Sequence, residues 1–235
     1  MDVTERCSAQ QWRDMARTEI EKAFAANKRP VIVGGTGLYL KALMQGLSEV
    51  PEIDPEFRER GNALQRELGN PAFHAELQKL DPIMAERLNP NDTQRLIRAY
   101  EVFLGTGRSL AYWQESPRMG PPDDWRFTVM IATPDRAELH RRCNARFDIM
   151  TQTGAMEEVE ALSARIDRGE VPADAPITHA LGYTPLAAYL RGTMTLEDAL
   201  FQAKAETRQY AKRQDTWFRN QMKPAATIEE IRFVP

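Results

Sequence analysis

The sequence has few cysteines and histidines and no long hydrophobic run. Its 235 residues include two cysteines and three histidines, and neither type shows a metal-ligand spacing. No apolar run approaches the roughly 18 residues that span a bilayer, and the polar opening 1–6 is not typical of a signal peptide. These absences argue against a disulfide framework, a metal site built from cysteine and histidine, and a membrane protein. They predict a cytoplasmic chain with reduced thiols.

A large excess of charge of one sign is also missing. Lys and Arg total 31 and Asp and Glu total 34, so the formal net charge is −3. Hydrophobic residues make up 42% and charged residues 28%, as in ordinary globular proteins. Contact with nucleic acid would therefore need a local basic surface.

The order of predicted strands and helices is typical of an α/β protein. Pro30–Val33 predicts a buried strand that ends at a glycine turn, and Gly37–Leu47 returns to helical spacing. Phe127–Ala132 and Ile231–Val234 predict two further strands. Three strands are few for a parallel sheet, so we expect part of the sheet to be absent from this sequence.

Helix caps predict the remaining organisation. Ser8 begins a first helix, Asp135 begins one that reaches Gly154, and a long helix follows Thr195. Between residues 51 and 124, Asp54-Pro55, Asn70-Pro71, Asp81-Pro82 and Asn91-Asp92 each predict a helix start, and no strand is predicted. We therefore predict a discontinuous core of 1–50 and 125–235 with an all-helical insertion of 51–124.

The glycine turn is the first candidate site. Gly34 and Gly35 let backbone amides approach a ligand, the following helix start favours anions, and Thr36 adds a hydroxyl. The alternative is a plain strand-to-helix turn. The turn is not a Walker A loop, because no Gly-Lys-Ser/Thr follows.

Three helical segments place polar and basic residues together. Gln94, which suits an adenine edge, lies near Arg95 and Arg98, which suit phosphate. Arg142 and Arg146, four apart, could clamp a diphosphate. Lys204, Arg208 and Lys212 form a basic stripe that could follow a phosphate backbone. In each case the alternative is an ordinary solvated helix face.

The order of these motifs resembles the tRNA dimethylallyltransferase family. The similarity rests on Val33 to Leu43, Asp54 to Arg58, Asn91 to Val102, Gly107 to Leu110 and Thr207 to Asn220, and it covers about Ser8 to Asn220. The resemblance implies a P-loop-NTPase-like, nucleotide-binding α/β core with a helical tRNA-binding insertion. It also implies transfer of a dimethylallyl group from dimethylallyl diphosphate, with Mg²⁺, to the exocyclic amine of a flipped adenosine beside the anticodon.

The resemblance also implies roles for individual residues. Thr36 would lie at the reaction centre, and Arg142, Arg146, Gly34 and Gly35 would bind the diphosphate. The anticodon stem-loop would be bound by residues in four segments: Arg58; Gln94, Arg95, Leu96, Ile97 and Arg98; Gly182 and Tyr183; and Lys204, Arg208 and Lys212. We expect a monomer.

Two departures from the family pattern qualify these expectations. The family's P-loop, its N-terminal strand and its aspartate general base are not in this sequence, so residues 1–235 alone are expected to be inactive. His179 and Thr184 stand where the family has basic residues. The alternatives are a catalytically silent tRNA-binding fragment and an adenylate dimethylallyltransferase that acts on free nucleotides.

Overall fold

The chain divides into two compact units. The computed structural model describes residues 2–5 and 7–234, so Met1, Arg6 and Pro235 lie outside the description, with part of the opening segment 1–6. Unit 1 comprises Met1–Met44 and Pro122–Pro235, and unit 2 comprises Gln45–Pro121. The insertion predicted from the sequence, 51–124, begins and ends a few residues later than unit 2 does.

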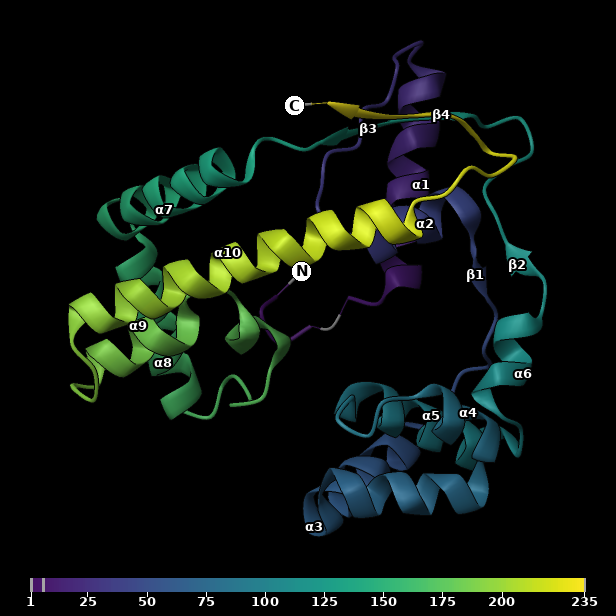
Figure 1. Cartoon of the computed structure of the whole chain (residues 1–235), viewed down its shortest axis with the longest axis horizontal. Helices are drawn as coiled ribbons and strands as arrows, with labels where there is room; N and C mark the ends of the chain where they lie inside the picture. The colour runs from purple at the N-terminus through teal and green to yellow at the C-terminus, as the bar shows by residue number, and fades with distance from the viewer. Residues whose placement is uncertain (1, 6, 235) are drawn as a thin grey trace. The chain divides into compact units, whose positions relative to one another are not determined.

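Unit 1 is mostly helical and contains one pair of parallel strands (Figure 1). Its elements are α1 (Ala9–Ala25), α2 (Gly37–Gln45), β3 (Phe127–Ala132), α7 (Arg136–Gln152), α8 (Ala155–Asp167), a 3₁₀ helix (Pro176–His179), α9 (Tyr183–Leu190), α10 (Leu196–Gln221) and β4 (Ile228–Val234). The capping box of α1 is confirmed: Ser8 Oγ accepts from Gln11 N at 3.1 Å, and Gln11 Oε1 accepts from Ser8 N at 2.9 Å. The caps of α7 and α10 at Asp135 and Thr195 are confirmed as well.

The sheet of unit 1 is a parallel pair. β3 runs alongside β4 from Phe127↔Ile228 to Ala132↔Val234, with an irregularity after Phe127. Helices α7 to α10 connect the two strands, as a parallel pair requires a long crossover. Ile131 and Ile228 are buried with Phe218 and Met222 at the end of α10. The predicted third strand therefore forms, but it begins at Ile228 rather than Ile231.

The predicted strand at 30–33 does not form. Its residues have no regular secondary structure, and the side chains of Val31 and Val33 are 78% and 91% exposed. A strand needs a neighbouring ladder for its backbone hydrogen bonds. In the part of the chain that is described, the ladder of β3 joins it to β4 and not to this segment. The β-branched run is therefore irregular chain whose valines are exposed to solvent.

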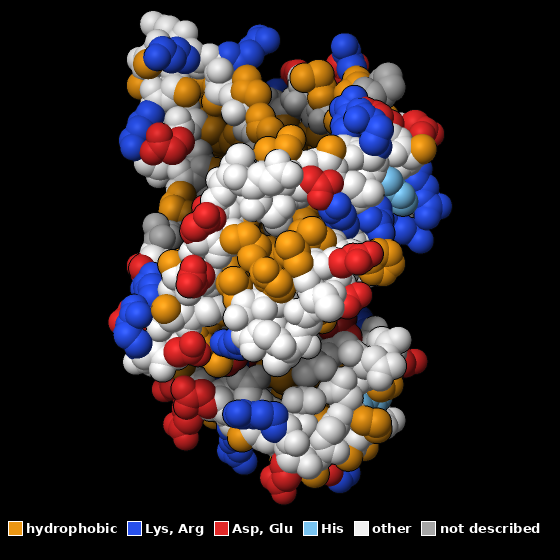
Figure 2. Space-filling model, turned by 90° about the vertical axis from the view of Figure 1, so that its left-hand side faces the viewer, with side chains coloured by type: hydrophobic (Ala, Val, Ile, Leu, Met, Phe, Trp, Pro, Cys, Tyr) orange, Lys and Arg blue, Asp and Glu red, His pale blue; other side chains and the backbone are white. Residues whose placement is uncertain are grey.

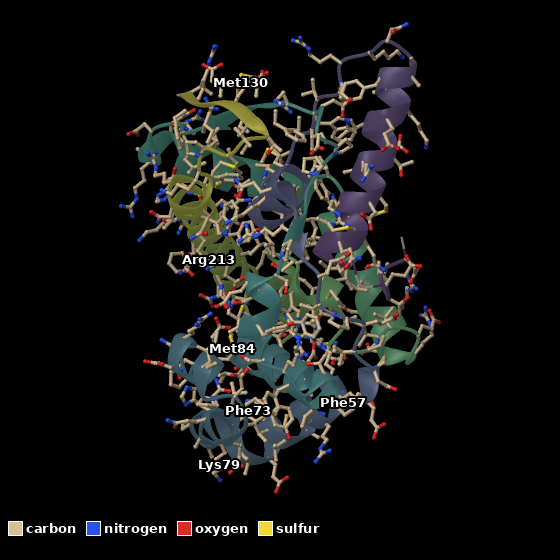
Figure 3. All side chains as sticks on the ribbon, turned by 90° about the vertical axis from the view of Figure 1, so that its right-hand side faces the viewer. Phe57, Phe73, Lys79, Met84, Met130 and Arg213 are labelled. Atoms are coloured by element: carbon tan, nitrogen blue, oxygen red, sulfur yellow. The ribbon has the colours of Figure 1, made fainter. Side chains whose placement is uncertain are left out.

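Unit 2 is a small helical domain closed by a short strand pair. Its elements are β1 (Leu47–Ser48), α3 (Pro55–Leu80), α4 (Pro82–Arg87), α5 (Thr93–Thr106), α6 (Leu110–Glu115) and β2 (Arg118–Met119). Phe73, Leu77 and Leu96 are fully buried in its core, with Met84 beside them; Phe73 and Met84 are labelled among these helices in Figure 3. β2, which pairs antiparallel with β1, lies within residues 51–124 and corrects the expectation that this range contains no strand.

The helix predicted to start at Asn70-Pro71 continues α3 across a kink. Gly69 has φ 71°, a left-handed conformation that favours glycine, and it separates two helical segments within α3, so the second segment follows the kink at Asn70-Pro71 as predicted. The side chain of Asn70 contacts the start of α5: its Nδ2 donates to Thr93 Oγ1 at 2.8 Å. Asp54, Asp81 and Asp92 cap helices as predicted. Among the described residues, no helix is long and apolar enough to cross a membrane.

Candidate functional site

The glycine turn of unit 1 packs directly on α10. Gln214 Nε2 donates to the carbonyl oxygen of Gly35 at 2.9 Å. A Cβ on Gly35 would lie 2.1 Å from that amide nitrogen, and a Cβ on Gly37 would lie 2.1 Å from the indole ring of Trp217. Gly37 therefore needs glycine because of its close approach to a ring, whereas a Cβ on Gly35 would displace the end of the Gln214 side chain and its hydrogen bond; neither glycine has a positive φ.

Thr36 lies between these two glycines. Its carbonyl accepts from Tyr39 N at 3.0 Å and begins α2, while the residue as a whole is exposed. Tyr39 anchors the new helix, because its hydroxyl donates to Cys7 O at 2.8 Å, and burial raises the pKa of that hydroxyl. The turn that carries Thr36 is thus fixed by the hydrogen bond of Gln214 to Gly35 on one side and by that of Tyr39 to Cys7 on the other.

A large groove of about 1270 Å³ lies beside the turn. It is bounded by α1, segment 29–35, β3, the start of α7 and the end of α10. Gly34 and Gly35 line it, as do Lys212 and Gln214, whereas Thr36 is not among its lining residues. Met130 of β3, labelled in Figure 3, is 71% exposed on its wall. Two of the predicted diphosphate residues therefore face an open groove that is partly apolar.

Arg142 and Arg146 are placed differently. Asn144 and Asp148 are residues of α7 that contact α10. Each arginine precedes one of them by two residues, about 200° around the helix, and therefore lies on nearly the opposite face. Arg142 Nε pairs with Glu138 at 2.6 Å, and neither arginine lines the groove. The structure therefore does not bring the two arginines together with Gly34 and Gly35 in that groove.

Glu138 is the charged partner of two arginines on α7. Hydrogen bonds from Arg141 and then Arg142 lower the pKa of its carboxyl from 4.5 to about 2. All three side chains are at the surface, so solvent screens the pairing. An anion that recruited Arg142 would have to displace this carboxylate.

The basic stripe of α10 is largely used inside unit 1. Lys204 pairs with Asp148 at 2.5 Å, and Arg208 Nη1 donates to Asn144 Oδ1 at 2.7 Å. Lys212 is exposed and lines the groove. Two of the three cations in the predicted stripe thus connect α10 to α7, and phosphate binding by the stripe stays a prediction. Figure 2 shows basic, acidic and hydrophobic side chains mixed on this side of the molecule.

A second polar cluster lies in unit 2. It joins α3 to α5 through Arg58, Gln94, Arg98 and Glu101. Arg58 Nη1 donates to Glu101 Oε2 at 3.3 Å, and its Nη2 donates to Gln94 Oε1 at 3.3 Å. Arg98 Nη1 donates to the other oxygen of Glu101. Three residues predicted to bind the anticodon loop are therefore neighbours in space.

Several other predicted RNA contacts are buried, whereas Arg95 is exposed. Leu96 and Ile97 are 0% and 2% exposed in the core of unit 2, so their side chains cannot contact RNA, which corrects that part of the prediction. Arg95 is exposed and pairs with Asp92 at 3.3 Å. In unit 1, Gly182 is buried with φ 91°, and a Cβ there would lie 2.6 Å from Phe147.

Tyr183, next to Gly182, begins α9, and its hydroxyl hydrogen-bonds to Ser163 at 3.3 Å. It packs against the core cluster that contains Phe147. Gly182 and Tyr183 thus belong to the packing between α7, α8 and α9. Among the described residues, no group of three or more His, Cys, Asp or Glu side chains is placed to hold a metal ion.

Comparison with known proteins shows the family to which the chain belongs. The sequence profile described as IPP transferase matches residues 1–221. The chain belongs to the IPP transferase family. The tRNA dimethylallyltransferase of Paramagnetospirillum magneticum is 48% identical over 97% of this chain and 70% of its own length. That of Rhodospirillum centenum is 48% identical over 96% of this chain and 71% of its own.

Solved structures agree with this IPP transferase assignment. The tRNA isopentenylpyrophosphate transferase of Bacillus halodurans is 32% identical, with a TM-score of 0.56, over 99% of this chain and 69% of its own. A eukaryotic dimethylallyltransferase acting on tRNA shares the fold, with a TM-score of 0.71 at 23% identity over 98% of this chain and 57% of its own.

Sequence reasoning missed three residues of this IPP transferase. Gln214 and Trp217 lie in the motif 207–220 and contact Gly35 and Gly37. Two motifs that are far apart in sequence are therefore in contact. Glu101 follows Ile97 by four residues on the inward side of α5. A carboxylate at an apolar position was the signal that could have revealed it.

Proposed function

We propose that this protein transfers a dimethylallyl group from dimethylallyl diphosphate to the exocyclic amine of an adenosine next to the anticodon of tRNA. The observation that carries the proposal is membership of the IPP transferase family together with 48% identity to a tRNA dimethylallyltransferase. In the reaction the amine nitrogen bonds to the allylic carbon, the carbon–oxygen bond to diphosphate breaks, and one amine proton is released.

The glycine turn supports the proposal that unit 1 binds dimethylallyl diphosphate. We infer a P-loop-NTPase-like core in which Gly34, Gly35 and Thr36 face the diphosphate. The Gly35 carbonyl is occupied by Gln214, so the turn is fixed before a ligand arrives. Such preorganisation favours stabilisation of the charge that develops on the leaving diphosphate.

Mg²⁺ is expected from the resemblance, but the groove does not provide a ready site for it. Two of its carboxylates are already bonded: Asp135 Oδ2 accepts from Ala137 N at 2.9 Å, and Asp215 pairs with Arg219 at 2.9 Å. Within the described ranges 2–5 and 7–234, no group of three or more His, Cys, Asp or Glu side chains is placed to hold a metal ion, so these residues do not fit a protein-held magnesium ion. We propose that Mg²⁺ would arrive with the diphosphate oxygens, which commonly supply its ligands, and we assign it no step.

The arginine cluster of unit 2 supports a role for tRNA. The side chains of Arg58 and Arg98 are 37% and 41% exposed, and Gln94 lies beside Arg58. Arginine forks suit phosphate, and glutamine can make paired hydrogen bonds to an adenine edge. We propose this cluster, with Arg95, as the contact with the anticodon loop.

A transfer assay tests the proposal. The protein is incubated with tRNA and dimethylallyl diphosphate, and digested nucleosides are analysed by mass spectrometry, with AMP as a competing acceptor. Transfer to tRNA supports the proposed function and overturns the expectation that residues 1–235 are inactive alone. Salt-dependent tRNA binding without transfer favours the silent fragment, and transfer to AMP alone favours the adenylate enzyme.

Thr36 offers a sharper test within the same assay. Thr36→Val should reduce kcat/KM about 100-fold if the hydroxyl stabilises the transition state, and Thr36→Ser should retain most of the activity. Thr18→Val on exposed α1 is the matched control for loss of a hydroxyl. Equal kcat/KM for Thr36→Val and Thr18→Val would exclude a role for Thr36 in the reaction.

A further inference from the structure

Unit 2 contains a buried carboxylate that no proposed step uses. Glu101 is 2% exposed on α5, where the adjacent Tyr100 and Val102 are also buried. Arg58 from α3 and Arg98 from α5 bind its two oxygens separately. Burying a carboxylate is unfavourable unless charged donors compensate it, and an apolar residue of similar size would often be as stable. Stability alone therefore does not explain the buried charge, whereas orientation of the two arginines does.

Arg58 and Arg98 bind a buried carboxylate, and both side chains are partly exposed to solvent. Their side chains are 37% and 41% exposed, whereas that of Glu101 is 3% exposed. Arg58 also donates to Gln94, so the carboxylate, both guanidiniums and the amide form one connected network. Because a guanidinium carries five donors in a planar fork, an edge bound to Glu101 leaves other donors directed elsewhere.

We propose that Glu101 is a positioning residue that orients Arg58 and Arg98, and through Arg58 also Gln94, toward the anticodon loop. This inference rests on the proposed function, because it assigns the arginine cluster to RNA. It goes beyond that function, since Glu101 itself does not contact RNA. The carboxylate fixes two long side chains that would otherwise lose rotamer freedom on binding, so less entropy is lost when RNA binds.

The sign of one substitution distinguishes positioning from simple electrostatics. Glu101→Gln removes one negative charge near the RNA, so electrostatics alone predicts tighter binding. Positioning predicts weaker binding, about tenfold, because the glutamine keeps one acceptor oxygen, so one of the two arginine hydrogen bonds is lost and the other loses its anionic acceptor. The matched control is Glu115→Gln, which makes the same change in charge in the same unit at an exposed pair with Arg87, 3.4 Å apart.

Binding is measured by fluorescence anisotropy with an anticodon stem-loop RNA at several salt concentrations, and circular dichroism checks the fold. We expect Glu101→Gln to weaken binding and to lower the salt slope, with Glu115→Gln unchanged or slightly tighter. Folded Glu101→Gln that binds as tightly as Glu115→Gln overturns the inference while leaving the proposed function intact. Absence of RNA binding by the unsubstituted protein overturns both.

A second comparison keeps the test decisive if Glu101→Gln unfolds. In a chain that carries Arg58→Gln and Arg98→Gln, adding Glu101→Gln removes an unpaired buried charge and should restore thermal stability. A residue that acts only through the two arginines then has nothing left to position, so RNA affinity should stay within about twofold of the double variant. A further tenfold loss in the triple variant would show that Glu101 acts on RNA by another route.

Discussion

Adding one methyl group at Gly37 should destabilise the glycine turn, whereas the same change at Gly34 should not. A Cβ on Gly37 would lie 2.1 Å from Cε3 and 2.2 Å from Cζ3 of Trp217, and a Cβ on Gly34 meets nothing within 4 Å. Neither glycine has a positive φ, so backbone strain does not contribute to the comparison. The difference between the two variants therefore isolates the contact with α10.

The magnitude follows from two opposing terms. Overpacking a well-packed contact costs about 1–3 kcal/mol. Alanine recovers up to about 1 kcal/mol over glycine in a helix, and Gly37 is the first residue of α2. Gly37→Ala should thus lose about 1–2 kcal/mol of unfolding free energy, which lowers Tm by about 2–8 °C in a chain of this size. Gly34→Ala should be neutral or slightly stabilising.

Thermal and urea unfolding followed by circular dichroism at 222 nm measure the effect. Trp217→Phe lacks the two ring atoms closest to the added methyl, so Gly37→Ala should cost about 1 kcal/mol less in that background. Equal stability of Gly37→Ala and Gly34→Ala, or strict additivity with Trp217→Phe, would refute the argued contact between the turn and α10.

Three further outcomes follow from the described contacts. Gln214→Leu removes the hydrogen bond to Gly35 and should lower stability by about 0.5–1.5 kcal/mol and speed tryptic cleavage in segment 28–35; cleavage no faster than in Gln202→Leu would contradict this. The Glu138 carboxyl should titrate by NMR near 2, so its stabilising pairing is complete above 4.5 and declines as pH falls toward 2; a midpoint at 4.5 would contradict it. Ser8→Ala should cost about 1 kcal/mol, and an unchanged Tm would show that the capping box contributes nothing.

Local signals in the sequence predicted much of the fold. Caps at Ser8, Asp135 and Thr195 depend on side chains that bond to backbone a few residues away, so they can be identified without tertiary knowledge. The segment 30–33 could not be assigned this way. Its β-branched composition favours a strand, but a strand also depends on a partner ladder, which lies elsewhere in sequence.

The candidate site shows the same division between local and long-range information. Gln94 and Arg98 share one helix, and the spacing that predicted their proximity is intrinsic to that helix. Their connection to Arg58 through Glu101 spans 43 residues between α3 and α5, and no local pattern contains it. Likewise, the spacing of Lys204 and Arg208 was visible, but the contact of both with α7 was not.

Helix α10 has a consequence for how unit 1 unfolds. Its 26 residues make a rod about 39 Å long, and it contributes Ala203 to one hydrophobic cluster and Phe218 to another. A single continuous helix that is anchored in both clusters cannot leave one and stay ordered in the other without breaking its own backbone hydrogen bonds. Melting of the α7–α9 region and of the β3–β4 region should consequently coincide, as one cooperative transition rather than two.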